Sequence, residues 1–214
     1  MSITNYTELQ AAVADWLHRA NLTARIPDFI QMGEGVLNRK LRTVDMETRS
    51  ISAAPTASRF LALPAGFLEM QSMFIQEPAT EMVYVEPLAL REMVVSETAT
   101  GFPSAYTIRN EIEFNIIPSQ TYTLEMHYFK RYDIAADSTN WLLTNYPDLY
   151  LYASLSAAAL YIDNDSRLAT VKALLAEGIE ECNLSEYRKR GIPNAYMRVD
   201  DAMHISGSFN VTHG

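Results

Sequence analysis

The sequence contains a single cysteine, Cys182, and only four histidines among its 214 residues. One cysteine excludes an intrachain disulfide and argues against a secreted fold that depends on such bonds. The histidines share no spacing with the cysteine or with a carboxylate pair that would suggest a metal site. We therefore predict no disulfide framework, no bound metal and no cofactor.

Basic residues are also few. The chain has 17 lysines and arginines against 26 aspartates and glutamates, which gives a net charge of -9. Each DNA phosphate that a protein neutralises needs a lysine or an arginine, so this balance disfavours general DNA binding.

Motifs typical of catalysis are absent. The sequence has no GxSxG, HExxH or P-loop. Gly33 and Gly35 imitate a dinucleotide fingerprint, but Asn38 takes the third glycine position within a helical pattern, and close packing of another helix explains the glycines better. "DNDS" at 163–166 begins like a calcium loop, but Leu168 replaces the required glycine, so we interpret it as an interhelical turn. No catalytic residues are predicted, and the protein is not expected to be an enzyme.

The longest uncharged run, residues 149–162, is too short for a membrane anchor. At about 1.5 Å per helical residue it covers roughly 21 Å, less than the ~30 Å hydrocarbon core. The N-terminus "MSITNYTELQ" lacks the basic start and apolar region of a signal peptide. We expect a protein that is made in a cytosol and does not associate with membranes.

Apolar residues at helical spacing predict four helices, over residues 5–20, 26–42, 145–162 and 166–190. Asn5 with Glu8 forms a capping box for the first helix, and Pro27 suits the first turn of the second. Asn145 is expected to cap the third helix, with Pro147 and Asp148 in its first turn.

Between these helices the period changes to alternation. "EIEFNIIP" and "TYTLEMHYF" place apolar residues on one side and polar residues on the other, as half-buried antiparallel strands do. About six or seven strands are expected between residues 46 and 132, with a short helix starting at Pro87.

The fold class predicted from this order is α+β. The N- and C-terminal helix pairs are expected to form a four-helix bundle with an inserted antiparallel β module and an extended C-terminal tail. The predicted domains are a helical bundle from residues 1–44 and 137–190, a β domain from 45–136, and a C-terminal arm from 191–214.

Two interpretations of the tail stay open. It is a disordered terminus, or it is an arm that orders on a partner, since its apolar residues are spaced like anchors along an extended segment. The anchors of the arm would be Tyr196, Met197, Ile205, Phe209 and Val211.

The third predicted helix is apolar on nearly every side, and must therefore be covered on nearly every side. Its small residues, from Ala153 to Ala159, favour a close helix approach, either within one subunit or between neighbours in an assembly. We assign helix packing to Trp141, Tyr152, Ala153, Ser156 and Ala157.

Three stretches carry a resemblance to a known family. They are "YTELQAAVADWLHRANLTARIPDFIQMGEGVLNRKLR", "LPAGFLEMQSMFI" and "TNWLLTNYPDLYLYASLSAAALYIDNDSRLATVKALLAEGIEECN". They resemble the head-to-tail adaptor (connector) proteins of short-tailed bacteriophages. Asn140, Trp141, Pro147, Asp148 and Tyr152 stand where the pattern of that family has them.

This resemblance implies a non-enzymatic structural protein of the virion neck. It would form a ring of about twelve copies, a dodecamer, bound to the portal protein above and the tail nozzle protein below. DNA would pass through the central channel without specific binding, and the C-terminal segment would reach the portal. Assembly would take place in the host cytoplasm.

Two other functions are weighed against this one. A tail-associated hydrolase would need a carboxylate or histidine site that the sequence does not offer. A DNA-packaging accessory protein would bind duplex DNA in a salt-sensitive way, which the net charge of -9 disfavours.

Overall fold

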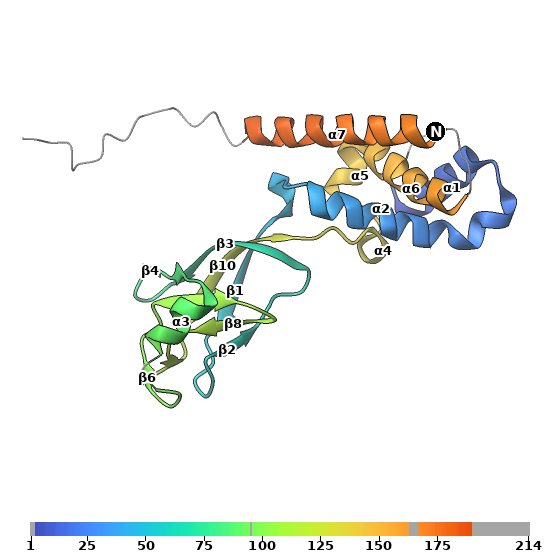
Figure 1. Cartoon of the computed structure of the whole chain (residues 1–214). Helices are drawn as coiled ribbons and strands as arrows, with labels where there is room; N and C mark the ends of the chain where they lie inside the picture. The colour runs from blue at the N-terminus through green and yellow to red at the C-terminus, as the bar shows by residue number, and fades with distance from the viewer. Residues whose placement is uncertain (1–2, 95, 163–166, 190–214) are drawn as a thin grey trace, which may run out of the picture.

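The computed structural model describes residues 3–94, 96–162 and 167–189. The long helices gather in one lobe and the strands in a second lobe (Figure 1). Each lobe has its own hydrophobic core: one is built around Leu9, Leu37 and Tyr150, the other around Met73, Phe114 and Leu124. The domain boundaries at residues 44/45 and 136/137 stay a prediction.

The N-terminal helices lie close to their predicted ranges. Helix α1 spans Tyr6–Leu17, the 3-10 helix η1 spans Ala20–Arg25, and α2 spans Ile26–Lys40. Asn5 caps α1, because its side chain accepts a hydrogen bond from the Glu8 backbone N at 3.0 Å. The Glu8 carboxylate accepts from the Thr4 backbone N at 2.7 Å, so the capping interaction extends one residue further back than predicted.

The C-terminal part of the helical lobe contains α4 (Ile134–Asp137), α5 (Trp141–Asn145), α6 (Pro147–Tyr161) and α7 (Leu168–Lys189). The prediction that Asn145 caps α6 is wrong. Asn145 ends α5 instead, and its side-chain amide donates to the Trp141 carbonyl at 2.8 Å. Asn140 caps α5, since its side chain accepts from the Leu143 backbone N at 2.8 Å, whereas α6 begins after Tyr146 without a side-chain cap.

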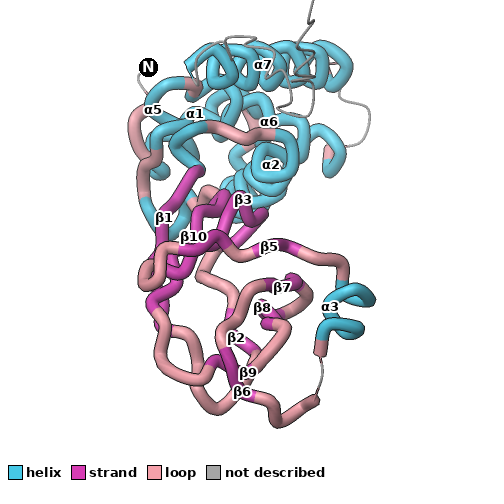
Figure 2. The backbone as a smooth tube through the Cα atoms, turned by 90° about the vertical axis from the view of Figure 1, so that its left-hand side faces the viewer, coloured by secondary structure: helices cyan, strands magenta, loops and turns pink. Residues whose placement is uncertain are grey.

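The predicted four-helix bundle is also wrong. Figure 2 shows α7, α6 and α2 one above another, with α1 beside them. Helix α6 is central, and α2, α7 and α1 each pack against it. In a four-helix bundle every helix lines a shared core and keeps an outer polar face. Because α6 has no polar face along its uncharged run, it is packed between other helices rather than on the outside of a bundle. Shorter helices and strands are interspersed between the four long helices.

The β lobe contains three sheets and the short helix α3 (Pro87–Met93), which begins at the predicted residue. The first sheet has the order β1 (Glu47–Ala53), β10 (Thr123–Lys130), β3 (Phe67–Ile75), β4 (Thr80–Glu81). The second has the order β2 (Phe60–Ala62), β8 (Glu111–Phe114), β7 (Ala105–Ile108), β5 (Val83–Tyr84). The third pairs β6 (Thr100–Gly101) with β9 (Ile117–Pro118).

The alternation predicted for β10 is confirmed. Leu124, Met126 and Tyr128 are buried in the β-lobe core, while Glu125 and His127 lie on the opposite face. The β lobe is not purely antiparallel, however, because β5 runs parallel to β7 and β6 parallel to β9. A parallel pair needs a crossover connection, and α3 lies on the one between β5 and β7.

Candidate interaction groove on helix α6

Helix α6 is in close contact with α2 through a glycine. A Cβ atom at Gly33 would lie 2.8 Å from the backbone of Ala153 and Ser154. The two helix backbones therefore touch at this point, which explains why a glycine is placed inside α2. Gly35 has no such role, because its Cβ would meet only the side chain of Arg39 at 3.5 Å.

Two other helices cover α6 on further sides. A Cβ atom at Gly178 of α7 would lie 2.7 Å from Leu149, so α7 is also packed tightly on α6. On the α1 side the ring of Trp16 meets the ring of Tyr152 edge-on, with centroids 6.5 Å apart. Each of these contacts involves a different part of the α6 surface.

Among the residues that the structure describes, one side of α6 is left open. A groove of about 880 Å³ runs there between α2 and α7. Its floor is Ala153, Ser156, Ala157 and Leu160 of α6, and its walls include Met32 of α2 and Leu175 of α7. We call this the α6 groove.

The α6 groove exposes large apolar side chains. Leu160 is 69% exposed, Met32 61% and Tyr161 61%. Burying a large apolar side chain stabilises a protein by about 1.5–3 kcal/mol, so an open groove with three such residues is typical of an interaction site.

Among the described residues, the charges that line the groove are of one sign. Arg39, Lys40 and Lys172 are the charged residues that line it, and all three are basic. They stand out in a chain of net charge -9. A smaller hollow that shares Lys40 and Ala176 with the groove continues along α7 to Asn183 and Leu184 and adds one acid, Glu180. The whole surface is therefore apolar with a mainly basic rim.

The residues predicted for helix packing are found in several different contacts. Ala153 meets α2 at Gly33, and Tyr152 meets Trp16 of α1. Ser156 and Ala157 are half-buried and lie in the floor of the groove. Trp141 lies in α5, beneath the ammonium group of Lys189 at 4.6 Å from the ring centre. The predicted arm anchors, Tyr196, Met197, Ile205, Phe209 and Val211, are outside the described residues.

The C-terminal end of α7 is fixed to the junction between the lobes. The buried Glu186 carboxylate accepts hydrogen bonds from the Val44 backbone N at 2.9 Å and from Lys189 at 2.5 Å. Asn183 donates to the Lys40 carbonyl at 3.1 Å. These contacts fix the end of α7 next to the smaller hollow at Lys40 and Leu184, which adjoins the α6 groove.

A buried carboxylate lies beneath α6 on its α2 side. The same oxygen of Glu34, Oε1, accepts from the Tyr150 hydroxyl and from the Ile134 backbone N, both at 2.8 Å. Asn140 donates to the Tyr150 hydroxyl at 2.7 Å. Burial raises the pKa of Glu34 above its ordinary value, although its two hydrogen bonds oppose that shift. Sequence reasoning missed this network, because Glu34 appears in the sequence only as a polar residue between two glycines.

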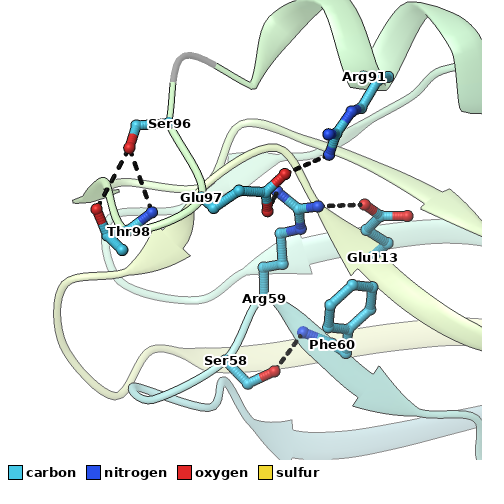
Figure 3. A network of polar contacts seen from close by, with 8 residues as sticks. All are labelled: Ser58, Arg59, Phe60, Arg91, Ser96, Glu97, Thr98 and Glu113. Atoms are coloured by element: carbon cyan, nitrogen blue, oxygen red, sulfur yellow. Dashed lines mark hydrogen bonds and ion pairs between the residues drawn. The ribbon is translucent and has the colours of Figure 1, made fainter.

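The β lobe has an arginine network of its own (Figure 3). The buried guanidinium of Arg59 contacts Glu97 at 2.8 Å and Glu113 at 3.2 Å. Glu97 also pairs with the exposed Arg91 of α3, so one carboxylate connects α3 to the strand that begins at Phe60. These arginines are neutralised by carboxylates, and we interpret the network as structural.

The described residues were also compared with the requirements of a metal site and of a membrane-spanning helix. Within the described ranges, no group of three histidines, cysteines, aspartates or glutamates is placed to hold a metal ion. None of the helices in the described part of the chain combines the length and apolar content needed to cross a membrane.

The comparison with protein families decides the identification. The family model described as SU10 adaptor protein matches residues 4–198. The chain belongs to this adaptor family. No curated protein matches the chain. The match spans both lobes and all of the α6 groove, and it confirms the resemblance to phage head-to-tail adaptors found in the sequence. The protein is thus a structural adaptor of a bacteriophage and a component of the virion neck.

Proposed function

We propose that this adaptor forms a ring between the portal protein and the tail nozzle protein, with a central channel for DNA. The ring would contain about twelve copies related by cyclic symmetry. The observation that carries the proposal is the open side of α6 in a chain that belongs to an adaptor family. Helix α6 is packed against α1, α2 and α7, and within the described residues its groove side is covered by no other element.

The contact between neighbouring copies is assigned to the α6 groove. Small residues at Ala153, Ser156 and Ala157 would allow a neighbouring element to approach the α6 backbone closely. In a ring the contact is heterologous, so the groove of one copy would meet a different surface of the next copy. The predicted role in helix packing thus becomes, for Ser156 and Ala157, a proposed role between subunits.

The net negative charge of the chain suits a subunit that surrounds a DNA channel. At a net charge of -9 the subunit would repel DNA phosphates rather than bind them, which favours passage over adhesion. The C-terminal arm, residues 191–214, is proposed to bind the portal through Tyr196, Met197, Ile205, Phe209 and Val211. Its removal should leave a folded protein and weaken portal binding at least about tenfold, a loss of roughly 1.4 kcal/mol.

Native mass spectrometry of the chain mixed with purified portal tests the ring. We expect a complex with one defined number of adaptor copies per portal ring. Ala157→Arg, which places a charged side chain in the groove, should prevent that complex, whereas Ala11→Arg on the exposed face of α1 should not. A chain that stays monomeric with portal, or an Ala157→Arg variant that still assembles, would contradict the proposal.

A further inference from the structure

The apolar groove is open in the described residues, yet the same chain carries a segment of complementary character. Residues 191–214 follow α7 and include the run "VDDAM" at 199–203, in which Asp200 and Asp201 are flanked by apolar residues. The charged residues that line the groove are Arg39, Lys40 and Lys172. The segment carries two acids, Asp200 and Asp201, against one base, Arg198, so it has a net charge of -1. Its acidic, apolar run matches an apolar groove with a basic rim.

The position and length of the segment suit this groove. Helix α7 is described as far as Lys189, which is held near Trp141 and Glu186, and the hollow at Lys40 and Leu184 opens beside that end of the helix. From Leu184 back to Lys172 the surface along α7 is about 18 Å long, at ~1.5 Å per helical residue. The residues after Lys189, if extended, could cover about 80 Å. Gly191 and Pro193 favour a change of direction at the start.

From these observations we infer that, in the free adaptor, the C-terminal segment 191–214 docks in the α6 groove of its own chain, with Asp200 and Asp201 facing Arg39 and Lys172. The segment would cover Leu160, Tyr161 and Met32, which are the most exposed apolar residues of the groove.

Docking of the segment would also delay assembly until portal is bound, an effect that rests on the proposed function. If the segment leaves the groove to bind portal, the surface assigned to the neighbouring copy is uncovered at that moment. Ring formation would then begin on the portal, and free adaptors would not associate through an exposed groove.

Thiol labelling in the absence of portal tests the docking directly. Ser156→Cys places a thiol of nearly the same size in the floor of the groove. The native Cys182 gives little background, because it is fully buried and burial raises its pKa to about 11. Ala11→Cys on the exposed face of α1 is the matched control outside the groove.

In the full chain we expect the thiol introduced by Ser156→Cys to react at least about tenfold faster when Asp200→Lys and Asp201→Lys are added. Combining these two changes with Arg39→Glu and Lys172→Glu should restore the slow rate, because the charges are complementary again. The Ala11→Cys thiol should react at one rate in all these backgrounds, and thermal unfolding verifies that each variant is folded.

Two results would overturn the inference. One is an unchanged labelling rate after Asp200→Lys and Asp201→Lys. The other is protection that increases with protein concentration, which would assign the groove to a second copy even in the free protein. The labelling experiment contains no portal, so its result does not depend on whether a ring forms. Docking of the segment and formation of the ring are therefore tested separately.

Discussion

At the scale of single residues, Gly33 has the most demanding position in the helical lobe. An added Cβ would lie 2.8 Å from backbone atoms of α6, and backbone cannot move aside as a flexible side chain can. The residue type is therefore determined by the distance between two helices, not by the conformation of α2.

Gly33→Ala should destabilise the protein by about 2 kcal/mol, because the overlap with α6 outweighs the gain in helix propensity. Gly35→Ala is the matched control in the same helix. Its Cβ would meet only Arg39 at 3.5 Å, so it should stabilise α2 by up to about 1 kcal/mol. Urea unfolding of both variants measures the difference. Equal effects of the two substitutions would show that the close contact between α2 and α6 is not present.

The buried carboxylate of Glu34 predicts how the stability of the folded protein changes with pH. Its pKa is raised in the folded protein, chiefly by burial, so the folded state holds the proton more tightly than the unfolded state. Stability contributed by this group is present below the unfolded pKa of about 4.5 and declines as pH rises through the folded pKa. Glu34→Gln removes the titration, and its stability relative to the natural protein should improve between pH 4 and pH 7.

Glu8 is the control for the sign of this effect. Its pKa is lowered, mainly by hydrogen bonds from Thr4, so its contribution is present above the unfolded pKa and is lost as pH falls. Glu8→Gln should therefore lose stability relative to the natural protein over the same rise in pH. Thermal unfolding at several pH values measures both variants, and parallel curves for the two would contradict the account.

At the scale of elements, the arginine network connects α3 to the β lobe. Arg59→Ala should cost about 3 kcal/mol, because it leaves the buried Glu113 without its cation. Arg91→Ala removes an exposed partner of the same Glu97 and should cost at most about 1 kcal/mol. Chemical denaturation compares the two variants. Similar losses would mean that Arg59 acts only as a surface ion pair.

The elements were largely predictable from local pattern. The helical spacing in residues 26–42 and 166–190 and the alternation in "TYTLEMHYF" each identify their element and its buried side. How the helices pack could not be predicted in this way. The uncharged surface of α6 fits a bundle position and a central position equally well, and the choice depends on the contacts of α6 with Gly33 and Gly178 of two other helices. The parallel pairing of β5 with β7 likewise depends on a connection through α3.

The candidate site was predictable only in part. Ser156 and Ala157 were singled out as small residues suited to close packing, and they lie in the groove floor. The basic rim was not found, because Arg39 and Lys172 are far apart in the sequence and meet only across the folded groove. The buried Glu34 was missed for the same reason, since its partners Ile134 and Tyr150 lie in distant segments.

At the scale of the whole molecule, the described residues form a helical lobe that carries the α6 groove and a β lobe joined to it. The end of α7 is tied to the segment between α2 and β1 through Glu186 and Asn183. The last described turn of α7 is therefore fixed beside the groove. This arrangement supports the proposal that one surface serves first the chain's own segment and then a neighbouring copy.

The proposed ring, with the α6 groove of each copy against its neighbour, is tested most directly by an electron-microscopy map of the neck assembled from purified portal and this adaptor. We predict a closed ring in which Ser156, Ala157 and Leu160 of every copy lie against the neighbouring adaptor. A ring in which these residues face solvent, or an assembly without contacts between adaptor copies, would contradict it.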